Sequence, residues 1–158
     1  MLSSDVVDLL HSGCSLVVGL VTAAGRPQTG RAWGLSLADD HRTARVVLSA
    51  ADVASLGHLA GARLGTIAVN GADVLTLRSV QLKGPIAGVE RADGRDAARM
   101  AAHCDAFFDA VAVADAIPRS RMERLLPAEV VACTFEIVEA YDQTPGPAAG
   151  RPLDRGPA

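Results

Sequence analysis

The chain has few aromatic residues, a single lysine and no cysteine pattern typical of a disulfide framework. Aromatic side chains make up only 3% of the 158 residues, whereas 49% of the residues are hydrophobic. We therefore expect a core of Val, Leu and Ala in one domain of ordinary size. The net charge of −3, with the arginines spread along the chain, argues against a nucleic-acid partner, which requires clustered positive charge.

The three cysteines, Cys14, Cys104 and Cys133, form no CxxC pair. Their odd number argues against disulfide bonding, and we expect small buried side chains in a reducing compartment. The N-terminus lacks the basic segment of a secretion signal, and no apolar run approaches the length that spans a membrane. The sequence therefore predicts a cytoplasmic protein with no membrane partner.

Several common functional motifs are absent. There is no GxGxxG after a strand, no GxxxxGK[ST] phosphate loop and no GxSxG nucleophile elbow. The histidines at 11, 41, 58 and 103 are scattered, so no metal site is predicted. His103 flanks the apolar stripe of a predicted helix, where a structural role and a ligand role are both open. If the protein is an enzyme, a bound organic cofactor supplies the chemistry.

Hydrophobic periodicity predicts an antiparallel barrel with added helices. The expected strands run over 15–23, 28–38, 44–49, 64–70, 75–89 and 130–141, and the expected helices cover 6–11, 52–59, a long segment after Asp93 and a turn after Pro118. Asp52 is expected to cap its helix, and Asn70-Gly71 is typical of a turn. Arg45 is expected to face solvent from the third strand.

One domain is expected over residues 1–142, with a separate tail over 143–158. The tail holds four prolines and three glycines, counted from Gln143. This composition does not support regular structure, so the tail is expected either to lie across a surface or to be disordered.

Three stretches of the chain carry a resemblance to a known family. In VVGLVTAAGRPQTGRAWGL an apolar strand, a G-x-P turn and an arginine-bearing strand follow one another. A strand, a helix and a strand follow in VVLSAADVASLGHLAGARLGTIAV, and RSVQLKG is similar to an Arg-Gln-Val-x-x-x-Gly strand. In this order, over about residues 13–90, they resemble the pyridoxamine 5′-phosphate oxidase-like, FMN-binding split barrels.

The resemblance implies a six-stranded antiparallel split β-barrel of the α+β class, mostly β with helices. It also implies a homodimer that binds FMN at the subunit interface and acts on a small-molecule substrate. In such proteins basic side chains from the second strand and from the segment after the third hold the phosphate. Arg31 matches the strand-two arginine, and Ser49 begins the segment after the third strand. Ser79 falls where the family's flavin-contacting glutamine lies.

The chain departs from the family pattern at two places. The family's Ser-Arg-Lys run appears here as Ser-Ala-Ala-Asp over 49–52, with no basic residue before Arg63. The C-terminal Trp and Arg segment of the true oxidases is also missing. The sequence therefore predicts an FMN-dependent oxidoreductase that is not a true pyridoxamine phosphate oxidase. The alternatives are the same barrel with a deazaflavin or haem, or a cofactor-free binding or structural dimer.

Strand alternation places Ser79, Gln81 and Lys83 on one face of the sheet. The resemblance implies that this face binds the cofactor. Lys83, the only lysine, is expected either to offset the negative charge of the cofactor or to lie at the barrel rim, where it could pair with Glu136. Trp33 either stacks on the cofactor or fills the core or the dimer contact.

Overall fold

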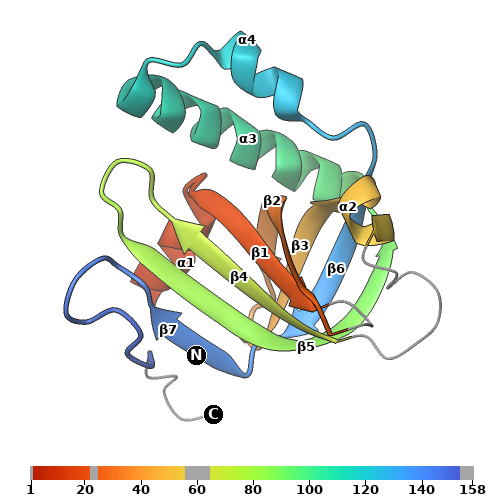
Figure 1. Ribbon diagram of the computed structural model, residues 1–158, viewed down its shortest axis with the longest axis vertical. Coiled ribbons are helices and arrows are strands. Elements are labelled where there is room, and N and C mark those ends of the chain that lie inside the picture. Colours follow the sequence, from red (N-terminus) through yellow and green to blue (C-terminus); the bar gives the residue numbers. More distant parts are fainter. Residues whose placement is uncertain (1, 22–24, 56–64, 154–158) are drawn as a thin grey trace.

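The computed structural model describes residues 2–21, 25–55 and 65–153, and Figure 1 shows their arrangement. The strands are β1 (Ser15–Val21), β2 (Pro27–Leu37), β3 (Thr43–Ser49), β4 (Thr66–Ala72), β5 (Ser79–Arg91), β6 (Val130–Glu136) and β7 (Glu139–Asp142). The helices are α1 (Ser4–His11), α2 (Ala50–Ser55), α3 (Gly94–Asp115) and α4 (Arg119–Met122), followed by the 3-10 turn η1 (Glu123–Leu125).

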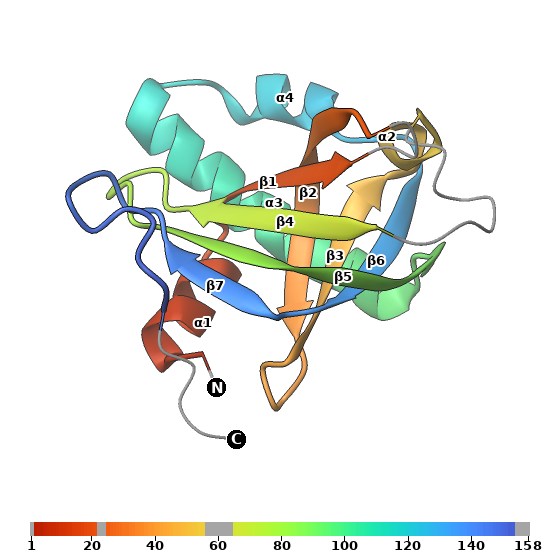
Figure 2. The same ribbon diagram turned by 60° about the horizontal axis from the view of Figure 1, so that its bottom comes forward.

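The strands form an antiparallel barrel in the order β4-β1-β2-β3-β6-β5-β7, and pairing of β4 with β5 closes it. Six strands make the barrel, and β7 extends the sheet along the first half of β5 (Figure 2). The predicted α+β split barrel is therefore confirmed.

The last predicted strand is broken in two. β6 pairs with the second half of β5 and β7 with its first half, so both lie along the same edge of β5. The break falls at Ile137 and Val138, beside Gly84 of β5, where a Cβ atom would lie 1.6 Å from the carbonyl oxygen of Glu136. Only glycine allows the two backbones to come this close.

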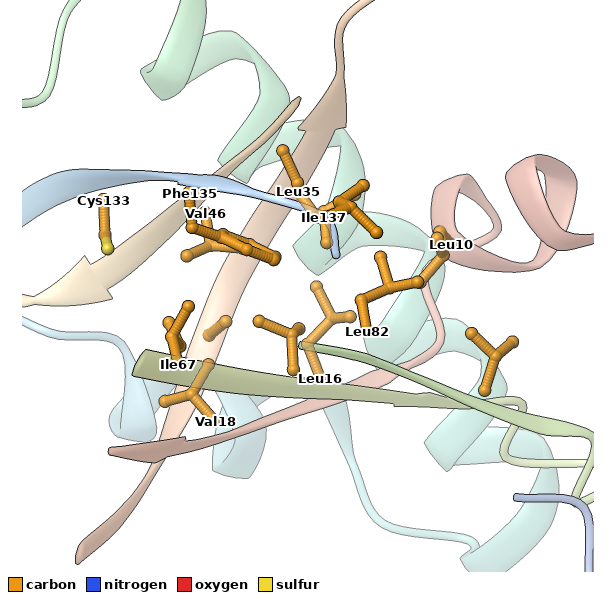
Figure 3. Close-up of a cluster of buried hydrophobic side chains, with 14 of the residues drawn as sticks. Leu10, Leu16, Val18, Leu35, Val46, Ile67, Leu82, Cys133, Phe135 and Ile137 are labelled. Atoms are coloured by element: carbon orange, nitrogen blue, oxygen red, sulfur yellow. The ribbon is translucent and has the colours of Figure 1, made fainter. Parts of the chain in front are cut away.

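Two helices cover the ends of the barrel. α1 lies at one end and inserts Leu9 and Leu10 into the core, and α2 lies at the opposite end and contributes Val53 (Figure 2). The barrel core is aliphatic apart from Phe135, Cys14 and Cys133, as the composition predicts. Figure 3 shows Leu16, Leu82 and their neighbours meeting inside the barrel.

The long helix α3 lies over the outer face of β2, beside the barrel core rather than within it (Figure 1). Its stripe of Cys104, Phe107 and Val111 packs on Trp33 and Val47. Asp93 begins the helix with a capping box that joins its side chain to the backbone of residue 96. The predicted start and apolar stripe of this helix are both confirmed.

The structure corrects two predictions about local structure. Asp52 does not cap its helix, because α2 already begins at Ala50, and the Ser49 hydroxyl accepts a hydrogen bond of 3.4 Å from the Asp52 backbone N–H. Asn70 and Gly71 lie inside β4 rather than in a turn, because pairing with β1 and β5 on both sides outweighs the local turn preference. The predicted helical residues 56–59 lie outside the described residues.

The three cysteines are buried and free, as predicted. Burial raises the pKa of the Cys14 and Cys133 thiols to about 12 and that of Cys104 to about 11. Such thiols stay protonated and act as small apolar side chains.

The described part of the tail folds back along β7. Backbone hydrogen bonds join Asp142 to Gly150 and Arg151, and the N–H of Leu153 donates to Ala140 at 2.8 Å. Leu153 packs against the barrel core. The tail was expected either to lie across a surface or to be disordered, and residues 143–153 lie across the surface beside β7.

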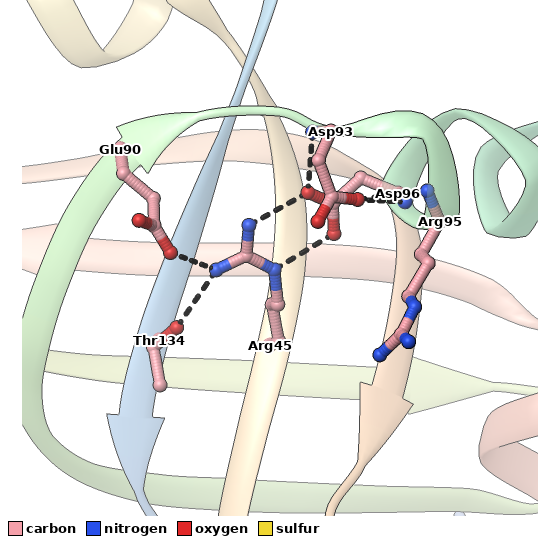
Figure 4. A network of polar contacts seen from close by, with 6 residues as sticks. All are labelled: Arg45, Glu90, Asp93, Arg95, Asp96 and Thr134. Atoms are coloured by element: carbon pink, nitrogen blue, oxygen red, sulfur yellow. Dashed lines mark hydrogen bonds and ion pairs between the residues drawn. The ribbon is translucent and has the colours of Figure 1, made fainter.

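Arg45 does not face solvent freely, contrary to the prediction. Its guanidinium binds both carboxylate oxygens of Asp96, at 2.8 and 2.7 Å, and also contacts Glu90 and Thr134 (Figure 4). Arg45 comes from β3 and Asp96 from the first turn of α3, so this polar network ties the helix to the sheet. The same hydrogen bonds lower the pKa of the Asp96 carboxyl.

Candidate functional site

A row of side chains crosses the outer face of the barrel from β2 to β7. Arg31 pairs in register with Val17, Val17 with Asn70, Asn70 with Gln81, and Gln81 with Tyr141. Residues directly opposite on neighbouring strands share a face of the sheet, so these five side chains lie on one side. Arg31 and Gln81 are three strands apart, roughly 14 Å along the sheet.

The polar residues of β5 face outward, as the alternation predicts. Val80 and Leu82 point into the barrel core, which leaves Ser79, Gln81 and Lys83 on the outer face. The side-chain amide of Asn70 donates to the Ser79 hydroxyl at 3.2 Å. Hydrogen-bonding groups from two adjacent strands therefore meet at one place on this face.

Lys83 lies at the β7 side of the same face. Its Nζ atom is 4.8 Å from the centre of the Tyr141 ring, within range of a cation–π interaction. Glu139 lies opposite Lys83 in the β-ladder, and its carboxylate accepts a hydrogen bond from the Tyr141 hydroxyl at 2.8 Å. Lys83 makes no ion pair with Glu136 or with any other described residue.

Arg31 lies at the opposite end of the row, beside α3. Its guanidinium carbon is 4.9 Å from the centre of the Phe107 ring and 6.0 Å from that of Trp33. No carboxylate in the described part of the chain pairs with this half-buried cation, and burial lowers its pKa. An arginine whose guanidinium contacts aromatic rings rather than a carboxylate retains its hydrogen-bond donors for an external anion.

The remaining two sequence-predicted residues lie close to Arg31. Trp33 is 6% exposed and packs in the cluster beneath α3. It is linked to the cross-strand row by its ring, which lies near the Arg31 guanidinium. Ser49 ends β3, one residue beyond Leu48, which pairs with Ala32 next to Arg31. The structure thus gathers Arg31, Trp33 and Ser49 at one end of the outer face and Ser79, Gln81 and Lys83 at the other.

A cavity of about 130 Å³ lies next to Arg31 at the barrel end covered by α2. Apolar side chains of the barrel and of α2 line it together with four polar residues, Gln28, Thr29, Arg31 and Asp52. The segment after β3 therefore contributes a carboxylate where the resemblance implies basic side chains.

Two basic residues of α3, Arg99 and His103, lie on the side of the helix that packs on β2. The sequence singles out His103, with a structural and a ligand role both open, but it places neither residue beside this face. Arg99 donates from Nε to the Leu35 carbonyl at 2.6 Å, and its buried Nη2 atom has no hydrogen-bond partner among the described residues. His103 is 3% exposed and stacks on Phe107, and its buried Nδ1 atom likewise finds no partner in the described part of the chain. The spacing of these residues, four apart on a helix next to an apolar stripe, was the available signal.

The electrostatic surroundings of His103 are positive. Burial, with further contributions from Arg99 and Arg31, lowers its pKa to about 4. The imidazole is therefore neutral near pH 7.

The part of the chain that the structure describes shows neither a metal site nor a membrane-spanning helix. No group of three His, Cys, Asp or Glu side chains could hold a metal ion there. None of the helices there combines the length and the hydropathy needed to cross a bilayer.

Comparisons with known proteins place the fold. No protein-family model matches the chain, and no curated protein does. Among solved structures, HupZ from Group A Streptococcus aligns with a TM-score of 0.57 at 15% identity, over 95% of this chain and 100% of that chain. An F420 reductase aligns with a TM-score of 0.52 at 14% identity, over 84% of this chain and 93% of that one.

A putative pyridoxamine 5′-phosphate oxidase from Lactobacillus delbrueckii is similar at a TM-score of 0.51 and 13% identity, over 89% of this chain and 93% of that chain. At such identities the likeness shows the fold alone. The fold is that of the pyridoxamine 5′-phosphate oxidase-like split barrels, and the resemblance inferred from sequence is confirmed at this level.

Proposed function

We propose that this protein is an oxidoreductase that binds FMN on the outer face of the barrel between two subunits. The observation that carries the proposal is the cross-strand row. At one end it has an arginine that forms no ion pair with the described residues, and further along it has polar groups of β4 and β5. A flavin mononucleotide needs both features, a cation for its phosphate and hydrogen-bonding groups for the edge of its ring.

The residues present fit this cofactor in three respects. Arg31 has free donors for a phosphate, and the Gln81 amide can donate to and accept from the ring edge. Lys83 supplies a positive charge on the same face, where it would offset negative charge on the ring. When bound, the flavin supplies the electron and hydride chemistry, and the chain positions it and sets its electrostatic environment.

The homodimer is part of the proposal. Val17 and Val21 on the outer face of β1 are 41% and 48% exposed, although both belong to a central strand of the sheet. Around them lie small or uncharged side chains, including Gly19, Ala68 and Asn70. A second copy covering this face would bury the valines and enclose the cofactor site.

A deazaflavin is the second candidate. The F420 reductase shares the fold, and F420 is a deazaflavin with an anionic substituent that Arg31 could also bind. A cofactor-free dimer is favoured only by the carboxylate of Asp52 in the segment after β3.

The visible absorption spectrum of freshly purified protein tests the proposal, followed by titration with FMN and with F420. We expect flavin absorption, or quenching of added FMN fluorescence with saturation at one FMN per chain. Saturable binding of F420 without FMN binding would favour the deazaflavin. Absence of binding by either cofactor would contradict the proposed function.

A further inference from the structure

We propose that Asp52 holds a divalent cation, Mg²⁺, that bridges the chain to the phosphate bound at Arg31. Gln28 and Thr29 complete the protein ligands of the ion. The inference rests on the proposed function, since the phosphate is that of FMN. It assigns to a metal ion the positive charge that the resemblance implies for the segment after β3 and that Ser-Ala-Ala-Asp over 49–52 lacks.

The first argument is the position of the Asp52 carboxylate. α2 follows β3 directly and places Asp52 beside β2, where Oδ2 lies 3.5 Å from the point that a Cβ atom at Gly30 would occupy. Gly30 lies between Thr29 and Arg31 and adds no side chain to the cavity. Asp52 and Arg31 therefore line the same cavity, yet they form no ion pair with each other.

The second argument is the balance of charge in this cavity. A phosphomonoester carries a charge of roughly −1.5 to −2 at pH 7. Arg31 is the one cation among the described residues that line the cavity, and its charge is offset by that of Asp52. The charge of a bound phosphate would then stay uncompensated in a partly enclosed site, which is unfavourable. One divalent cation compensates it.

The third argument is the chemistry of the donor atoms. Asp52 offers a carboxylate, Gln28 an amide carbonyl and Thr29 a hydroxyl. These are hard oxygen ligands, which Mg²⁺ prefers to nitrogen and sulfur. Because Mg²⁺ is typically held by one or two carboxylates together with phosphate oxygens and water, one carboxylate is sufficient here.

The ion and the cofactor should bind together. Within residues 2–21, 25–55 and 65–153 no group of three His, Cys, Asp or Glu side chains could hold a metal ion without other ligands. The phosphate supplies the remaining oxygen ligands. The cavity of about 130 Å³ also has room for water, which takes up ~30 Å³ per molecule in the liquid.

The test measures the affinity for FMN and for riboflavin, which lacks the phosphate, with Mg²⁺ or with EDTA at constant ionic strength. In the wild type, Mg²⁺ should raise the affinity for FMN roughly tenfold or more and leave that for riboflavin unchanged. In EDTA, Asp52→Asn should bind FMN more tightly than the wild type, because the repulsion is removed, and Mg²⁺ should add little. Asp39→Asn, at an exposed aspartate of the turn between β2 and β3, is the control and should respond to Mg²⁺ as the wild type does.

The possible failures can be told apart. An FMN affinity of the wild type that is the same with Mg²⁺ and with EDTA would overturn the metal site but not the proposed function. A full Mg²⁺ effect in Asp52→Asn would overturn the role of Asp52. Binding of neither flavin under any of these conditions would contradict the proposed function and, with it, the metal site.

Mn²⁺ provides a readout that does not depend on a flavin signal. It takes oxygen ligands as Mg²⁺ does, and its paramagnetic resonance spectrum reports the fraction that is bound. Mn²⁺ should bind more tightly to the wild type with FMN than to FMN alone or to the wild type with riboflavin. Equal Mn²⁺ affinity of the protein with FMN and with riboflavin would overturn the bridge to the phosphate.

A folding defect in Asp52→Asn would not block the test, because Thr29→Val keeps the shape of the side chain and removes one oxygen ligand. We expect Mg²⁺ to raise the FMN affinity of Thr29→Val less than that of the wild type. Equal Mg²⁺ effects in the two proteins would overturn the site.

Discussion

The guanidinium of Arg31 lies 4.9 Å from the ring centre of Phe107 and pairs with no carboxylate of the described chain. This relationship joins β2 to α3 through a cation and an aromatic ring. It leaves the charge of Arg31 uncompensated at the end of a polar row on the barrel face. A cation held in this way is suited to an anionic ligand, and the account of function depends on it.

Lys83 should contribute to cofactor affinity if it faces an anionic ligand. Lys83→Met keeps the apolar stem and removes the charge, so FMN affinity should fall roughly 10- to 150-fold, as for the loss of one charge-assisted contact. Lys83→Arg should cost less, and added salt should weaken the wild-type complex more than the Met variant. Fluorescence titration measures all three.

Arg91→Met is the matched control for Lys83, because Arg91 is an exposed cation on the same strand. Equal FMN affinity in the wild type and Lys83→Met would show that Lys83 only packs against Tyr141.

The open face of β1 predicts how the protein assembles. Val17→Asp places a charge at the centre of the proposed interface and should convert the dimer to a monomer at micromolar concentration. Light scattering measures the mass. Val113→Asp, at a 75% exposed valine of α3, is the control and should leave the mass unchanged. A wild type that is already monomeric would contradict the dimer.

The bond between Arg45 and Asp96 should stabilise the packing of α3. Arg45→Met leaves the buried Asp96 carboxylate without its partner and should lower the free energy of unfolding by about 2–3 kcal/mol. Arg42→Met, at an exposed arginine just before the same strand, should change it little. Chemical denaturation gives both values. An equal effect of the two substitutions would contradict a structural role for the Arg45 network.

The buried His103 should make stability depend on pH. Its folded-state pKa of about 4 lies below the ordinary value of 6.5, so the unfolded chain takes up the proton first as the pH falls. Stability is then complete above pH 6.5 and decreases toward pH 4, by roughly 3 kcal/mol over this window. Arg99 and Arg31 both oppose protonation of His103, and no carboxylate among residues 2–21, 25–55 and 65–153 assists it.

Urea denaturation at several pH values tests the His103 prediction. His103→Phe should show a smaller loss of stability between pH 6.5 and pH 4 than the wild type. Parallel pH profiles of the two proteins would contradict it.

The barrel could be predicted from sequence because strand periodicity and the Asp93 cap are local signals. The break between β6 and β7 could not, since it arises from the approach of Glu136 to Gly84, residues 52 positions apart. The sequence predicts a turn at Asn70 because the local turn preference of Asn-Gly is strong, and the neighbouring strands that override it are remote in sequence.

The candidate site was predictable only in part. Alternation correctly placed Ser79, Gln81 and Lys83 on one face, because the period of a strand is a property of the chain itself. The alignment of Arg31 with Gln81 depends on three strand registers, which no local pattern fixes. The contact of Arg31 with Phe107 exists only because α3 packs on β2, and the pairing of Arg45 with Asp96 has the same tertiary origin.

The central claim is that Arg31 binds the phosphate of a flavin on the outer face of the barrel. Parallel titrations of FMN and riboflavin into the wild type and Arg31→Met test it most directly. We expect the wild type to bind FMN at least tenfold more tightly than riboflavin, and Arg31→Met to bind both with similar affinity. Equal affinity of the wild type for the two compounds, or an unchanged FMN preference in Arg31→Met, would contradict it.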